Sequence, residues 1–248
     1  MSDEARMPFT KHLEELRTRL IIIFIGVGVG FGICYYSSSF LVWILQRQLG
    51  EKLVFLSPTE AFFTRLKIAL FAGIFISMPL TLHQLWLFVM PGLLERERKY
   101  TLPFVIFGTI FFVIGASFAY FLILPYGLKF LLSFATPLLV PQIAFGFYVS
   151  FAFKLMFAFG IVFEMPLVTI FLVKLGVIDV EFLTRNRKYF FVLAFVIGAI
   201  LTPPDVFTQM MMAGPLLALY EVSIGVAKVL TRRRKAEEEE EEEEDEED

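Results

Sequence analysis

The chain has 248 residues, of which 57% are hydrophobic and 17% aromatic, including 31 phenylalanines. Soluble domains are typically about 45–50% apolar, so this composition excludes an ordinary soluble domain. The formal net charge of −3 hides an uneven distribution, because the last 12 residues are all acidic and the rest of the chain carries 22 basic against 13 acidic residues.

The acidic run divides the chain into two parts. Residues 1–235 contain all the apolar runs and are predicted to form a single membrane domain. Residues 236–248 are predicted to be a disordered acidic tail, because a block of like charges repels itself. The N-terminus lacks the pattern of a cleaved secretory signal, since charged residues come first and no small-residue cleavage site follows the first apolar run.

Six apolar runs predict an all-α, polytopic membrane protein with six transmembrane helices. Crossing about 30 Å of hydrocarbon takes about 20 helical residues, and the fifth run is shorter than this. We expect the last two helices to be short, and a re-entrant hairpin formed by runs five and six is the alternative. The predicted spans are Leu20–Tyr36, Ile68–Val89, Leu102–Leu124, Leu155–Val173, Tyr189–Leu201 and Phe207–Val229.

Helix breakers and small residues shape these spans. Proline removes a backbone donor and favours a kink, so kinked helices packed side by side are predicted to form a curved, concave wall. The prolines inside spans are Pro79, Pro166 and Pro215. In the first span, the pairs Gly26/Gly30 and Gly28/Gly32 allow another helix to approach closely, and we expect that helix to belong to the same chain.

The basic residues predict the orientation. One set of helix ends holds 16 Lys and Arg, and the opposite set holds six. Because cytoplasmic ends carry the excess of basic residues, both termini are expected in the cytoplasm. The amphipathic segment Phe40–Leu49 is expected to lie along the outer interface of the lipid bilayer, with Trp43 as its anchor.

Signatures of catalysis are absent from the sequence. It contains no P-loop, no HExxH zinc motif and no complete G-x-S-x-G motif. We therefore expect a protein that is not an enzyme, that has no cofactor or metal, and that does not bind nucleic acid.

Two segments at the predicted inner face carry acidic residues among basic ones. "TKHLEELRTRL" contains Glu15, which is spaced for an i,i+4 pair with Arg19, and "PGLLERERKY" contains Glu97. Two interpretations are open. Internal salt bridges would be worth about 0–1 kcal/mol when exposed. A pocket for a cationic ligand would exploit the two parallel hydrogen bonds that a guanidinium donates to a carboxylate.

Glu164 is the one charge within the fourth predicted span. An ionised carboxylate at the bilayer centre costs about 2.5–3.5 kcal/mol. A protonated Glu164 could occupy the kink at Pro166, where the carbonyl of Val162 lacks its helical donor. Alternatively, Glu164 faces a partly wet groove that a partner visits. A third interpretation is a proton-coupled small-solute transporter that uses Glu164 as its proton relay. Internal inverted repeats would favour such a transporter, and none is visible between the two halves of the sequence.

Five motifs occur in order along the chain: "HLEELRTRL", "SPTEAFFTRLKIAL", "PGLLERER", "AFGIVFEMP" and "LTPPDVFTQ". Together, on a six-span topology, they resemble the TatC family, the multispanning core of the twin-arginine protein translocase. The similarity covers residues 7–235. It implies a signal-peptide receptor that helps to export folded proteins bearing twin-arginine signal peptides, driven by the proton gradient.

The resemblance also implies roles for single residues. Glu15 and Glu97 match the acidic positions that receive the arginine pair. Phe88 matches an aromatic position beside them, and Arg17 matches a basic position that holds this surface in shape. Glu164 matches a buried acidic position exposed in a groove.

The last motif implies partners. Thr202, Asp205 and Gln209 lie where the family docks single-span TatA-like or TatB-like subunits. Self-association in a larger complex is expected as well, because a single chain of 28.5 kDa cannot enclose a folded cargo. The implied location is the plasma membrane of a bacterium or archaeon.

Overall fold

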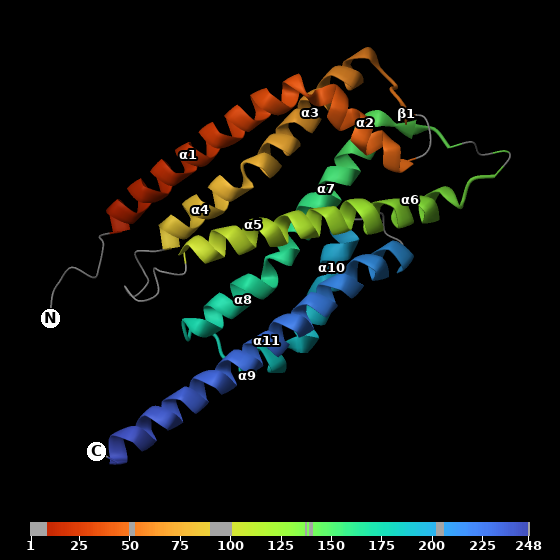
Figure 1. The fold of residues 1–248 in the computed structure, drawn as a ribbon. Coiled ribbons are helices and arrows are strands. Elements are labelled where there is room, and N and C mark those ends of the chain that lie inside the picture. Colours follow the sequence, from red (N-terminus) through yellow and green to blue (C-terminus); the bar gives the residue numbers. More distant parts are fainter. Residues whose placement is uncertain are drawn as a thin grey trace. The chain divides into compact units, whose positions relative to one another are not determined.

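α-Helices make up most of the described part of the chain (Figure 1). The computed structural model describes residues 9–49, 53–89, 101–136, 138, 141–201 and 206–247. The elements are α1 (Phe9–Tyr36), α2 (Ser38–Leu49), β1 (Leu53–Val54), α3 (Pro58–Ile76), α4 (Met78–Val89), α5 (Thr101–Phe118), the π-helical turn η4 (Ala119–Ile123), α6 (Leu124–Leu132), β2 (Ile143–Ala144), α7 (Phe145–Phe163), α8 (Met165–Lys174), α9 (Val180–Arg185), α10 (Arg187–Leu201) and α11 (Val206–Glu247).

Membrane-length helices account for five of the six predicted spans. Among the described residues, four stretches are long and apolar enough to cross a bilayer, and α3 with α4 forms a fifth candidate that is bent by 53°. This confirms the all-α polytopic fold. The four stretches are Lys11–Tyr36, Thr101–Leu132, Phe145–Lys174 and Val206–Arg232.

The last two helices differ from each other in length. α10 takes the place of the fifth predicted span, and its 15 residues reach only about 22 Å, as the sequence predicts. α11 is not short: it runs for 42 residues. The expectation of a short last helix is therefore wrong, because the helix starts at Val206 and nothing in its sequence ends it.

The helix continues through the acidic tail to Glu247, whereas the sequence predicts disorder there. Glutamate has a high helix propensity, and no glycine or proline interrupts the run after Gly225. Extending an existing helix also avoids the cost of nucleating a new one. These two effects favour helix over the charge repulsion on which the prediction of disorder was based.

Prolines explain where the spans break. Pro79 lies at the start of α4, next to the 53° bend, and Pro166 lies at the start of α8. Pro125 opens α6 directly after η4, where the missing proline donor frees the carbonyl of Phe121 and the chain passes through a π-helical turn. Pro215 lies inside α11 without ending it.

The helices cluster into two compact units: Met1–Ile110 with Ala135–Phe153, and Phe111–Phe134 with Lys154–Asp248. We call them unit 1 and unit 2. The sequence predicts a single membrane domain over residues 1–235, and whether the two units behave as one domain stays a prediction.

In unit 1, α1 lies alongside α3 and α4 (Figure 1). The contact between α1 and α3 depends on two glycines. A Cβ atom on Gly30 would lie 2.8 Å from the carbonyl oxygen of Gly73, and a Cβ on Gly73 would lie 2.6 Å from the backbone nitrogen of Phe31. The Gly26/Gly30 face thus packs within the chain, as expected, whereas Gly28 and Gly32 have nothing within 4 Å.

Within unit 1, Glu60 at the start of α3 connects this helix to the preceding loop and to α7. Its carboxylate accepts hydrogen bonds from the backbone of Leu56 at 2.7 Å and of Gly146 at 2.8 Å, at the start of α7. Ser57 caps α3 through the backbone nitrogen of Glu60. The short strands β1 and β2 pair in parallel beside this junction.

In unit 2, α11 packs against α8, α9 and α10. The ring of Tyr220 stacks on Phe190 with centroids 4.0 Å apart, and its hydroxyl donates to the carbonyl of Leu183 at 2.8 Å. α5 and α7 also meet closely, because a Cβ atom on Gly160 would lie 2.5 Å from the ring of Phe112.

We predict that Gly73→Val destabilises the protein by about 1–3 kcal/mol, because the new side chain would force the α1 and α3 backbones apart. The thermal unfolding midpoint in detergent measures this. Gly28→Val is the matched control, since a side chain there meets open space. Equal midpoints for the two variants would contradict the close approach.

Candidate functional site

The first candidate site lies at the N-terminal end of α1, where this helix faces α4 within unit 1. α1 runs unbroken from the charged segment into the first apolar run. His12, Glu15 and Arg19 follow each other at i, i+3 and i+7 and so share one face of the helix. Leu13 and Leu20 of the same helix are not packed against α4, since they are 48% and 42% exposed.

Arg19 connects Glu15 to α4. Its Nη2 lies 3.2 Å from Oε1 of Glu15, which confirms the predicted i,i+4 pair. Its Nη1 donates to Oε1 of Gln84 on α4 at 3.3 Å. The side chains of Glu15 and Arg19 keep 18% and 27% of their surface exposed, so the pair is held but accessible.

An aromatic contact lies one to two turns of helix away. The ring of Phe88 on α4 stacks on His12 of α1, with centroids 4.3 Å apart and planes 23° apart. Phe88 and Gln84 are four residues apart and therefore occupy one face of α4. Arg17 is exposed on α1.

The structure thus brings Glu15 and Phe88 to the same helix pair. Glu97, Thr202 and Asp205 lie outside the described residues. In the part of the chain that is described, no three His, Cys, Asp or Glu side chains gather as a metal site.

Sequence reasoning missed Gln84 and His12. Gln84 lies inside an apolar run, where an uncharged amide gives a weak signal, yet it is only 6% exposed and binds Arg19. The neighbouring His83 is the more conspicuous residue in the sequence, but it is exposed on α4. The signal that could have found Gln84 is its i,i+4 spacing to Phe88, which places both on the same helix face.

Glu164 lies between α7 and α8 and is 7% exposed. Its backbone carbonyl accepts from Val168 at 2.9 Å, but neither carboxylate oxygen has a hydrogen-bond partner among the described residues. The carboxylate therefore does not bond across the kink at Pro166. An unpaired buried polar group costs about 1–3 kcal/mol.

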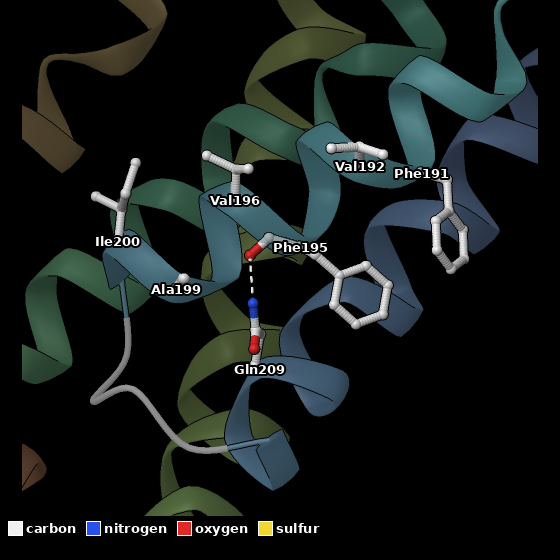
Figure 2. A pocket seen from close by; sticks show the side chains of 7 residues that line it. All are labelled: Phe191, Val192, Phe195, Val196, Ala199, Ile200 and Gln209. Carbon is white, nitrogen blue, oxygen red and sulfur yellow. Dashed lines mark hydrogen bonds between the residues drawn. The ribbon is translucent and has the colours of Figure 1, made fainter.

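A further candidate site, after the Glu15 site and Glu164, is a groove of about 400 Å³ along α10, in unit 2 (Figure 2). Six of its lining residues are apolar and come from α10, and the seventh is Gln209 from α11. The lining residues are Phe191, Val192, Phe195, Val196, Ala199, Ile200 and Gln209.

Gln209 is fixed in this groove from one side. Its Nε2 donates to the backbone carbonyl of Phe195 at 2.9 Å, as the dashed line in Figure 2 marks. A Cβ atom on Gly198 would lie 3.3 Å from Cγ of Gln209, so the glycine lets the amide approach α10. The groove thus presents one oriented amide on an apolar wall.

Comparisons with known proteins identify the family. Residues 11–215 match the family model "Sec-independent protein translocase protein (TatC)". The chain is 44% identical to the TatC protein of Desulforapulum autotrophicum, over 93% of this chain and 88% of that one. It is 46% identical to that of Aquifex aeolicus, over 92% and 97%.

A solved structure gives the same result. The crystal structure of the twin-arginine translocase receptor TatC matches with a TM-score of 0.80 at 46% identity, over 89% of this chain and 99% of that one. The family model, the relatives and the solved structure agree, and the chain belongs to the TatC family of Sec-independent protein translocase proteins.

Proposed function

We propose that this protein is the receptor for twin-arginine signal peptides and a core subunit of a translocase that exports folded proteins. The observation that carries the proposal is the partly exposed carboxylate of Glu15 at the inner end of α1, in a chain 46% identical to a twin-arginine translocase receptor. Family membership favours this function over a small-solute transporter.

Recognition follows from charge and shape. A guanidinium donates parallel hydrogen bonds to a carboxylate, so two acidic side chains on separate segments can receive two adjacent arginines. We assign Glu15 and Glu97 to this task. Phe88, which stacks on His12, supplies an aromatic wall beside Glu15, and the exposed Arg17 holds this surface in shape.

The orientation decides which peptides can reach this site. The protein is a multi-pass membrane protein, and we propose that both termini lie in the cytoplasm of a bacterium or archaeon, because 16 of its 22 basic residues lie at that set of helix ends. A newly made signal peptide then meets Glu15 before any export step.

We expect Glu15→Gln to weaken capture of a twin-arginine peptide strongly, because the size of the side chain is kept and its charge is lost. Truncating one partner of a partly desolvated charge pair costs about 2–5 kcal/mol. Photocrosslinking to purified protein measures the capture, and Glu97→Gln should act in the same direction.

Glu14→Gln is the control for this experiment. Glu14 is exposed at the preceding position of α1, and its substitution by Gln removes the same charge. Capture that falls equally in the Glu14 and Glu15 variants, or in neither, would refute the assignment.

The groove along α10 suits a single-span partner. A transmembrane helix finds no hydrophobic gain in leaving lipid, so a site for it needs close packing and hydrogen bonds. Gln209 provides an oriented amide, and α10 provides an apolar surface. We propose that a TatA-like or TatB-like subunit docks here, with Thr202 and Asp205 nearby in sequence.

We expect Gln209→Leu to reduce crosslinking of the single-span partner while signal-peptide capture stays unchanged, because an interhelical hydrogen bond of about 1 kcal/mol is lost. Met210→Leu is the control, since Met210 is exposed and apolar. Loss of both activities in the Gln209 variant would contradict separate sites.

Glu164 is proposed to face a polar groove that a partner or cargo visits during transport driven by the proton gradient. Its buried, unpaired carboxylate destabilises the resting protein and so calls for a role outside stability.

We expect Glu164→Leu to raise the thermal unfolding midpoint, because it removes a buried carboxylate without a described partner, which costs about 1–3 kcal/mol of stability. We expect the same substitution to lower the export of a folded cargo, because the polar group that the cargo or partner visits is lost. Unfolding in detergent and export in whole cells are the two measurements. Full export by the variant would show that the carboxylate has no part in transport.

A further inference from the structure

The inner-end site already contains a guanidinium, provided by the protein itself. Arg19 binds Glu15 through a single hydrogen bond of 3.2 Å, from Nη2 to Oε1. This contact is end-on, not the paired arrangement that a guanidinium and a carboxylate can form. Oε2 of Glu15 has no partner among the described residues and remains an acceptor.

Arg19 is held in place from the opposite side. Gln84 on α4 accepts from Nη1 of Arg19 at 3.3 Å, and Gln84 is 6% exposed. Nε of Arg19 is buried as well and has no partner in the described part of the chain. A guanidinium anchored to a second helix and partly sunk between two helices is not a surface group that leaves freely.

We propose that Arg19, anchored by Gln84, is a positioning residue that sets Glu15 for the signal peptide. Arg19 occupies one carboxylate oxygen, fixes the rotamer of Glu15 and leaves the other oxygen for the incoming guanidinium. The gain is preorganisation, since a carboxylate that is already ordered loses less conformational entropy on binding. This inference rests on the function proposed above.

The opposite role would be competition, in which Arg19 blocks Glu15 until a peptide displaces it. The anchor to Gln84 argues against it, because this bond holds Arg19 in place whether or not Glu15 is engaged. The two roles predict opposite signs. Removing a competitor tightens peptide binding, and removing a positioning residue weakens it.

The test measures the dissociation constant of a fluorescent twin-arginine peptide for the full-length protein in detergent or nanodiscs. We expect Gln84→Leu and Arg19→Gln each to raise the constant roughly five- to tenfold, which lies within the range known for coupled contacts. In a Glu15→Gln background, Gln84→Leu should add no further loss, because Gln84 acts through Glu15. A structural role alone would lower the unfolding midpoint without producing this dependence on Glu15.

His83→Leu on α4 is the matched control for Gln84→Leu, and Lys11→Gln on α1 is the matched control for Arg19→Gln. Both control residues are exposed. If Gln84→Leu fails to fold, Gln84→Met preserves the length of the side chain and takes its place. Tighter binding by Arg19→Gln, unchanged binding by the Gln84 variant, or an equal loss in the Glu15→Gln background would each overturn the proposal. Glu15→Gln without effect would overturn the receptor function itself.

Discussion

Hydrocarbon offers no hydrogen bonds, so each polar side chain within a span needs a partner in the protein or a surrounding other than lipid. Two amides in this chain follow that rule and in doing so join helices. Gln84 binds Arg19 between α4 and α1, and Gln209 binds the Phe195 carbonyl between α11 and α10. Glu164 does not follow it, since both of its oxygens are buried without a described partner. The candidate sites therefore lie where polar side chains would cost the most free energy if they faced lipid.

Close helix packing brings these polar side chains within hydrogen-bonding distance of the neighbouring helix. Gly30 and Gly73 let α1 and α3 touch through their backbones. The chain then bends by 53° next to Pro79, and α4 lies alongside α1. The Arg19–Gln84 hydrogen bond is already long at 3.3 Å, so we expect a side chain inserted at either glycine to weaken it. The geometry around Glu15 thus depends on residues that make no contact with it.

Peptide recognition and partner docking are assigned to different units of the chain. The Glu15 site lies on α1 and α4 in unit 1, and the Gln209 groove lies on α10 and α11 in unit 2. Each has a different chemistry: a carboxylate ordered by arginine in the first, and one amide on an apolar surface in the second. A translocase subunit that must recognise cargo and also assemble with other subunits is well served by two such separate surfaces.

Local pattern alone determined much of this protein. Apolar run length predicted the spans, proline positions predicted two of the breaks, and i,i+4 spacing predicted the Glu15–Arg19 pair. These features depend on residues within one helix, where spacing along the chain sets distance in space. Only the tertiary structure decided that α1 and α3 approach closely at Gly30 and Gly73. It also decided that Gln84 anchors Arg19 and that His12 stacks on Phe88. Those contacts join separate helices, and their partners are chosen by how the helices cross, which spacing within a single helix does not encode.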